Sequence, residues 1–119
     1  MTQTVLIIEN DTDTLDVLNE VVSGLPVNVV CRTETLELPK LKELKPSLIL
    51  LDHWLNGELG GDYCKLIKKD PETSKIPVIM ISAVTTLGAI ADNALADGHL
   101  RKPFDINYLE ELVKHYCGV

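Results

Sequence analysis

Short apolar runs alternate with helix-like segments five times along the chain, and this alternation is the feature that most limits how it folds. Three of the runs, 5–8, 48–51 and 78–81, are uninterrupted and rich in Ile, Leu and Val. Such runs are typical of strands that are covered on both faces. A fourth run lies at 27–31, and a shorter, more polar fifth run at 99–101. The alternation predicts right-handed strand–helix–strand units and a parallel sheet.

Between the runs, apolar residues recur at spacings of three and four, as amphipathic helices require. These segments lie at 15–22, 36–44, 63–69, 87–95 and 106–116. Pro39 lacks a backbone donor and is expected to confine the second helix to the residues after it. Asp105 is a good N-cap for the last helix, and Gly24 permits a left-handed end to the first.

These elements predict one domain over residues 1–119, an α/β fold built as a three-layer αβα sandwich. Its central layer is a doubly wound, five-stranded parallel sheet in the flavodoxin-like order 2-1-3-4-5. A chain of 119 residues buries enough surface for a hydrophobic core without disulfides or metals. Strands one and three are neighbours in this order, at the switch point where open α/β sheets bind their ligands.

Composition excludes several classes of partner. Lys and Arg number 11 and Asp and Glu 18, a net charge of −7, which argues against a nucleic-acid groove or an anionic membrane surface. The three cysteines, Cys31, Cys64 and Cys117, form no C-x-x-C pair, which argues against a zinc knuckle or a disulfide framework. No signal peptide and no apolar run long enough for a membrane span is found. We therefore expect a cytoplasmic domain.

Reactive side chains follow four of the predicted strands. Glu9 comes after the first, Asp52 after the third, Ser82 after the fourth and Lys102 after the fifth. Two carboxylates at one crevice repel each other unless they hold a proton or a cation, and an oxygen-only donor set favours Mg²⁺ over zinc. A carboxylate beside Mg²⁺, with a hydroxyl and an ammonium within reach, suits phosphoryl transfer onto Asp52.

At these positions the chain resembles the receiver domain of two-component response regulators, in particular the single-domain, chemotaxis-regulator-like kind. The resemblance rests on Glu9-Asn10 after the first strand, Asp52 at the end of the third, Ser82-Ala83 after the fourth and Lys102-Pro103-Phe104 after the fifth. It covers essentially the whole chain. Each piece alone is common, but all four in this order and at these spacings are specific.

The resemblance implies roles for the residues that handle the phosphoryl group. Asp52 is the expected phosphoacceptor. It is expected to receive its phosphoryl group from a phosphohistidine on a sensor histidine kinase or phosphotransfer protein. Ser82 and Lys102 are expected to contact the new phosphoryl oxygens, and His99 stands where the family has an aromatic switch residue. The Lys102–Pro103 peptide is expected to be cis. Such a protein is a regulator rather than an enzyme. Its output passes to a protein partner at the face formed by the fourth helix, fifth strand and fifth helix.

The resemblance also implies a Mg²⁺ site formed by Glu9, Asn10, Asp52 and the backbone carbonyl of Trp54. Asn10 stands where the family has an aspartate, so the site lacks one negative charge. We therefore expect weak Mg²⁺ binding and slow phosphorylation. The neighbouring Asp11 is a possible substitute ligand, although strand alternation directs its side chain elsewhere.

Two positions gate attacking water in such domains, two residues past the phosphoacceptor and two past the Ser or Thr. Here they are Trp54 and Val84, both apolar. We expect them to shield the acyl phosphate and to prolong its lifetime.

Several alternatives stay open. A degenerate receiver that is not phosphorylated and acts as a protein-interaction module is the main one, because of Asn10. A D-x-D-x-T phosphatase motif at 11–14 is disfavoured because Asp11 lies three residues past the strand, and a flavin site because the acidic first loop repels phosphate. Glu9 through Asp11 also read as a helix cap. His53 is expected at the surface, as is Lys68 on a solvated helix face.

Overall fold

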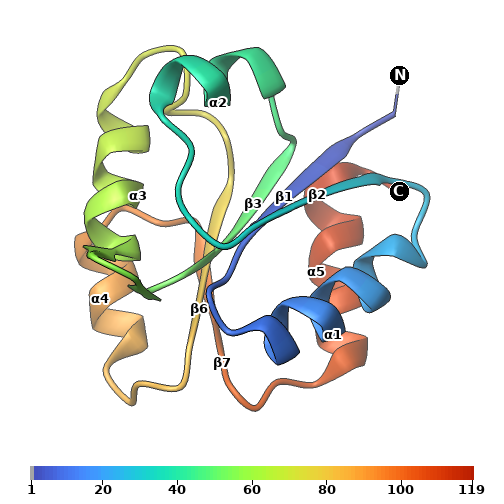
Figure 1. Ribbon diagram of the computed structural model, residues 1–119. Helices are drawn as coiled ribbons and strands as arrows, with labels where there is room; N and C mark the ends of the chain where they lie inside the picture. Colours follow the sequence, from blue (N-terminus) through green and yellow to red (C-terminus); the bar gives the residue numbers. More distant parts are fainter. Residues whose placement is uncertain (1) are drawn as a thin grey trace.

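The computed structural model describes residues 2–119, whose central feature is a five-stranded parallel sheet with helices on both sides (Figure 1). The sheet strands are β1 (Thr4–Ile8), β2 (Asn28–Arg32), β3 (Leu48–Asp52), β6 (Val78–Ser82) and β7 (Gly98–Arg101). They lie in the order β2-β1-β3-β6-β7. Counted along the chain, this is the expected order 2-1-3-4-5, so the predicted fold class is confirmed.

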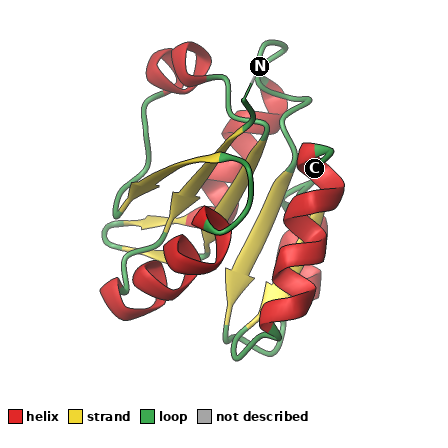
Figure 2. Cartoon of the chain, turned by 90° about the vertical axis from the view of Figure 1, so that its right-hand side faces the viewer, coloured by secondary structure: helices red, strands yellow, loops and turns green. Residues whose placement is uncertain are grey.

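Five helices cover the two faces of the sheet. They are α1 (Thr12–Ser23), α2 (Leu38–Leu44), α3 (Gly60–Lys69), α4 (Leu87–Asn93) and α5 (Ile106–Cys117). Helices α1 and α5 pack on one face and α2, α3 and α4 on the other (Figure 2). The result is the expected three-layer sandwich.

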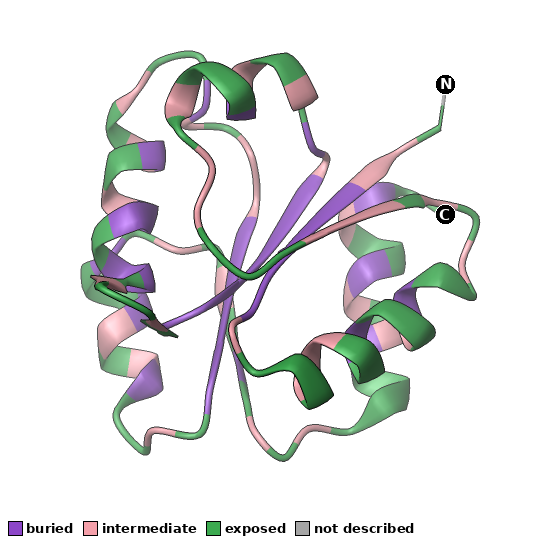
Figure 3. Ribbon diagram, in the orientation of Figure 1, coloured by how far each residue is buried: buried purple, intermediate pink, exposed green. Residues whose placement is uncertain are grey.

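Strand alternation divides the core into two clusters, one on each face of the sheet. In β1, Leu6 and Ile8 join the cluster under α2, α3 and α4, whereas Val5 and Ile7 join the cluster under α1 and α5. All four side chains are fully buried, and β3 and β6 are buried along their whole length (Figure 3). The uninterrupted apolar runs therefore follow from burial on both faces.

Most predicted helix ends agree with the structure. The Asp105 carboxylate accepts from the N–H of Asn107 at 2.7 Å and caps α5. Pro39 lies in the first turn of α2, where no intrahelical donor is lost. The expectation for Gly24 was wrong: it ends α1 with φ −71°, in the right-handed region, and its N–H bonds back to Val21 and Val22.

A short hairpin between β3 and α3 was not predicted. It consists of β4 (Trp54–Leu55) and β5 (Glu58–Leu59), paired antiparallel, with Gly57 at φ +76° in the turn. Two-residue strands carry too little periodicity to be recognised in the sequence. The hairpin leads directly into α3, which begins at Gly60, three residues earlier than expected.

The expectation that Lys68 lies on a solvated helix face was wrong. Its side chain is 8% exposed, and its ammonium donates to the carbonyls of Ser74 and Ile76 and to Asp97 Oδ2, at 3.2, 2.8 and 2.7 Å. These acceptors satisfy the charge, so the side chain can be buried. Within residues 2–119, no helix combines the length and apolar character needed to cross a bilayer.

Candidate functional site

Strand register brings two carboxylates together at the carboxyl edge of the sheet. β1 and β3 pair in parallel with Ile8 opposite Leu51, so Glu9 and Asp52 are the next residues on adjacent strands. Alternation directs both side chains to the face under α1 and α5, the face of Ile7 and Leu50. Glu9 is 1% exposed and Asp52 is 4% exposed. The expected convergence of these residues is therefore present in the structure.

Lys102 is the counter-ion of this pair. Its Nζ lies 2.5 Å from Glu9 Oε1, and it follows Leu100 on the same face of the sheet. Burial, together with the neighbouring Asp52 carboxyl, raises the pKa of Glu9 to about 7, whereas Lys102 acts in the opposite direction. Glu9 Oε2 is buried and, within residues 2–119, has no hydrogen-bond partner. A buried carboxylate oxygen without a hydrogen-bond partner is suited to take up a proton or to bind a cation.

The site opens into a cavity of about 480 Å³ at the ends of the strands. Its lining residues are Asn10, Asp11, Asp52, Trp54, Ser82, Ala83, Val84 and Lys102. Together with Glu9, these include each metal, phosphoryl-contact and shielding residue expected from the sequence. The loops after β1, β3, β6 and β7 contribute to it, as ligand sites at a switch point do.

Local hydrogen bonds orient the groups that face this cavity. The N–H of Trp54 donates to Asp52 Oδ1 at 3.3 Å, and the N–H of Val84 donates to Ser82 Oγ at 3.3 Å. The N–H of Lys102 donates to the Ser82 carbonyl at 2.9 Å, which joins the ends of β6 and β7. The Lys102–Pro103 peptide is cis, as expected.

Asp11 has a separate task. Its carboxylate accepts from the N–H and the hydroxyl of Thr14, at 3.3 and 2.5 Å, and caps α1. These hydrogen bonds lower the pKa of Asp11. The capping interpretation is thus correct for Asp11 and wrong for Glu9, whose bonds run to Lys102.

His99 lies apart from the cavity. It is exposed on β7, and a Cβ added to Gly88 of α4 would meet its ring at 3.5 Å. The ring therefore lies against the fourth helix.

The structure places His53 in the interior, so the expectation of a surface histidine was wrong. His53 is 6% exposed, its Nδ1 accepts from the N–H of Gly61 at 3.2 Å, and its ring contacts that of Trp54 edge-on at 4.9 Å between centroids. The sequence signalled this burial only through strand alternation. His53 directly follows Asp52, so its side chain faces the other side of the sheet, under α3 and α4.

The ligand atoms at this site are of the type that Mg²⁺ prefers, but together they carry little negative charge. The carboxylates of Glu9 and Asp52, the Asn10 amide and the Trp54 carbonyl are all oxygen donors, as Mg²⁺ prefers. Among residues 2–119, no three Asp, Glu, His or Cys side chains are arranged to hold a metal ion. With Lys102 already on Glu9, these residues provide a weaker electrostatic attraction than three carboxylates would.

Comparison with known proteins finds relatives along most of the chain. Residues 5–114 match the family model described as the response regulator receiver domain. The DNA-binding response regulator MtrA of Mycobacterium tuberculosis is 32% identical over 107 residues, which are 87% of this chain and 46% of that protein. The phosphate regulon transcriptional regulatory protein PhoB of Rhizobium meliloti is 32% identical over 111 residues, 87% of this chain and 48% of that protein. The chain thus spans about half the length of these curated relatives.

Solved structures share the fold. A putative response regulator from Chloroflexus aurantiacus superposes with a TM-score of 0.91 at 24% identity, covering all of both chains. The receiver domain of sensor histidine kinase PA1611 from Pseudomonas aeruginosa, with a magnesium ion coordinated in its active site cleft, has a TM-score of 0.84 at 20% identity, also with full coverage.

Proposed function

Because this chain belongs to the family of response regulator receiver domains, we propose that it is a phosphoacceptor of a two-component or phosphorelay system, phosphorylated on Asp52. We place it in the cytoplasm as a regulator rather than an enzyme, with a histidine kinase or phosphotransfer protein as donor. The observation that carries the proposal is the trio of Glu9, Asp52 and Lys102 at the carboxyl edge of the sheet, in which both carboxylates are buried and Lys102 is partly exposed. A trio that only stabilised the fold would not need to face a cavity of about 480 Å³ lined by Asp52 and Lys102.

The chemistry follows from these positions. An Asp52 carboxylate oxygen attacks the phosphorus of a phosphohistidine in line, the P–N bond breaks, and the released imidazole nitrogen takes a proton. The product is an acyl phosphate on Asp52. Lys102 and the Ser82 hydroxyl offer a positive charge and a hydrogen bond to the transferred oxygens. Glu9, Asn10, Asp52 and the Trp54 carbonyl would hold Mg²⁺, and the bound ion would offset negative charge on the transferred oxygens.

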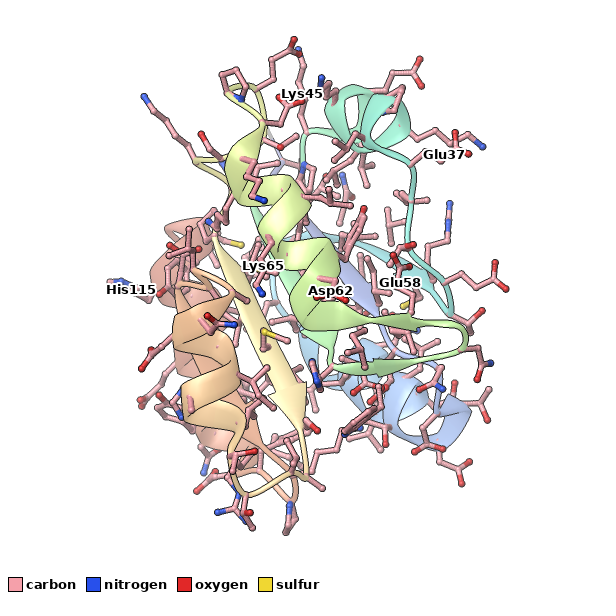
Figure 4. The ribbon with its side chains drawn as sticks, turned by 90° about the vertical axis from the view of Figure 1, so that its left-hand side faces the viewer. Glu37, Lys45, Glu58, Asp62, Lys65 and His115 are labelled. Atoms are coloured by element: carbon pink, nitrogen blue, oxygen red, sulfur yellow. The ribbon has the colours of Figure 1, made fainter. Side chains whose placement is uncertain are left out.

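Incubation with acetyl phosphate and Mg²⁺, followed by intact mass measurement, tests the proposal. One phosphoryl group is expected on the chain, and Asp52→Ala is expected to abolish it. Asp62→Ala is the matched control, because Asp62 is an exposed carboxylate on the outer side of α3 (Figure 4). An unlabelled wild-type chain, or a label that survives in Asp52→Ala, would overturn the assignment.

We propose further that Trp54 and Val84 shield the acyl phosphate from water. Both line the cavity beside Asp52, and Trp54 has an exposed fraction of 53%, so its side chain lies at the surface rather than in the core. Trp54→Asn is expected to speed hydrolysis of the phosphorylated chain about tenfold, because a polar side chain admits and orients water. Leu66→Asn, at an exposed apolar residue of α3 that does not line the cavity, is the control. Equal lifetimes in wild type and Trp54→Asn would contradict the shielding role.

The output surface that we propose is formed by α4, β7 and α5. A second cavity of about 390 Å³ lies there and includes His99, Tyr108 and His115 among its lining residues. A protein partner that recognises the phosphorylated state is expected to bind this face. Amide chemical-shift changes on phosphorylation should then extend from Ser82 to β7 and α5; changes confined to the cavity would argue against it.

A protein-interaction module that is never phosphorylated remains the second candidate. Asn10 favours it, as does the Glu9–Lys102 ion pair, which already satisfies the charge that a phosphoryl group would engage. The acetyl phosphate experiment separates the two candidates.

A further inference from the structure

The side chain of His53 lies directly beneath the phosphoacceptor loop, and none of the roles above uses it. His53 is only 6% exposed. Burying an imidazole costs free energy relative to an apolar side chain unless the ring nitrogens form hydrogen bonds. Its Nδ1 accepts the N–H of Gly61, the second residue of α3. The ring proton is therefore on Nε2.

This hydrogen bond supplies a cap that the local sequence does not. The N-cap residue of α3 is Leu59, whose side chain makes no capping hydrogen bond. The first N–H groups of a helix have no intrahelical acceptor and need an outside one. His53 provides two: its carbonyl accepts from Gly60 at 2.7 Å, and its ring accepts from Gly61 at 3.2 Å.

The capped turn is in direct contact with the backbone that carries Asp52. A Cβ on Gly60 would lie 2.0 Å from the Asp52 carbonyl oxygen, so the two backbones touch. On the other side, the N–H of His53 donates to the Ile81 carbonyl at 3.3 Å. His53 therefore joins the end of β3 to β6 and to the start of α3, one residue from the phosphoacceptor.

The ring also reaches α4. Together with Gly61 it lines a cavity of about 240 Å³ that includes Ile90 and Asn93 of α4, and α3 and α4 lie next to each other on this face (Figure 4). Displacement of the first turn of α3 would act on the ring through the Gly61 hydrogen bond, and through the ring on the Asp52 loop.

We propose that His53 is a positioning residue for phosphoryl transfer, which holds Asp52 in place by capping α3 through Nδ1. The role rests on the proposed function of Asp52. It requires the acceptor at the Nδ1 position and not only a ring of this volume.

Two substitutions distinguish the effect of the hydrogen-bond acceptor from the effect of side-chain volume. His53→Leu replaces the ring with an apolar group of similar size and removes the acceptor. His53→Asn places Oδ1 at the same number of bonds from the backbone as Nδ1 and so keeps an acceptor there. Glu20→Leu, at an exposed position of α1 that lines none of these cavities, is the control. The readouts are hydrogen exchange of the Gly60 and Gly61 amides and the acetyl phosphate dependence of phosphorylation.

For His53→Leu we expect exchange at both glycines to rise at least about tenfold and the maximal phosphorylation rate to fall about tenfold, with half-saturating acetyl phosphate unchanged. His53→Asn should restore most of both, and Glu20→Leu should change neither. Unchanged exchange in His53→Leu, an unchanged rate, or a His53→Asn variant as slow as His53→Leu would each overturn the role.

Failure of the two proposals can be told apart. A wild-type chain that takes up no phosphoryl group overturns the function of Asp52 and the role of His53 with it. A wild-type chain labelled on Asp52 together with a fully active His53→Leu overturns only the role of His53. If His53→Leu does not fold, His53→Gln replaces it, because the Gln acceptor lies one bond further out. His53→Asn must then be the faster of the two, and the reverse order overturns the role.

Discussion

Asn10 is the residue at which this chain differs from the acidic pair of the family it belongs to. It lines the cavity with a neutral amide, close to the carboxylates of Glu9 and Asp52, and Lys102 pairs with Glu9. A divalent cation entering this site meets one negative charge fewer than in a site with three carboxylates. We expect this difference to lower the Mg²⁺ affinity directly and the phosphorylation rate through it.

Asn10→Asp is expected to raise Mg²⁺ affinity at least about tenfold, because a third carboxylate adds Coulombic attraction at short range. Titration with Trp54 fluorescence measures it, since Trp54 lines the same cavity. Asn19→Asp, which adds the same charge on the exposed side of α1, is the control. A submillimolar dissociation constant for the unaltered chain would contradict the premise of weak binding.

Tyr63 gives a pH dependence at the residue scale. Burial, with a smaller effect of the Glu58 charge, raises its pKa to about 12 from 10.0, and its hydroxyl donates to the Leu36 carbonyl. Between these values the unfolded chain loses the phenolic proton and the folded chain keeps it, so the free energy of unfolding falls as pH rises.

Tyr63→Phe should therefore remove this part of the alkaline decline, while costing about 1 kcal/mol near neutral pH for the lost hydrogen bond. Urea unfolding across the alkaline range measures both effects. Parallel profiles for Tyr63→Phe and wild type would be inconsistent with the raised pKa.

At the scale of elements, the junction of β3, the β4–β5 hairpin and α3 determines where Asp52 lies. Each helix with a strong apolar stripe was predictable, as were the strands with uninterrupted apolar runs. The hairpin was not, because its pairing of Trp54 with Leu59 is too short for a periodic pattern and depends on the close approach of Gly60 to the Asp52 carbonyl.

Two glycine substitutions test this junction. Gly60→Ala is expected to cost more than about 2 kcal/mol and to slow phosphorylation, because the new Cβ meets backbone that cannot move aside. Gly88→Ala, inside α4, meets only the His99 ring at 3.5 Å and is expected to stabilise the chain by about 0.5–1 kcal/mol. Denaturant midpoints measure both. A well-tolerated Gly60→Ala would contradict the close contact with Asp52.

At the scale of the whole molecule, hydrogen bonds and ion pairs between helices and the sheet stabilise the fold in addition to the two apolar clusters. Asp97 Oδ2 accepts from Lys68 Nζ and from the N–H of Val78, each at 2.7 Å, and so connects α3 with β6 and with the turn before β7. The Lys68 side chain is 8% exposed and the Asp97 side chain 38%, so water reaches this pair from the Asp97 side only.

A double-mutant cycle with Lys68→Met and Asp97→Asn should give a coupling of about 1–3 kcal/mol in the free energy of unfolding. The comparison cycle uses Lys42 and Asp70, 2.9 Å apart with side chains 31% and 20% exposed, for which a smaller coupling is expected. Similar couplings in the two cycles would show that burial of Lys68 adds nothing.

The sequence by itself determined the fold class, the strand order and the identity of the edge at which reactive side chains meet. These follow from local quantities: apolar periodicity, the handedness of strand–helix–strand units and the residue after each strand. Glu9, Asp52 and Lys102 could be placed together on that basis alone.

Only the tertiary structure decided which contacts these side chains make. Whether Lys102 binds Glu9, whether Asp11 caps a helix and whether His53 is buried all depend on how loops from distant parts of the chain pack. Periodicity carries no information about such contacts, because loops have no repeating pattern and each polar group takes the partner that packing brings within hydrogen-bond distance.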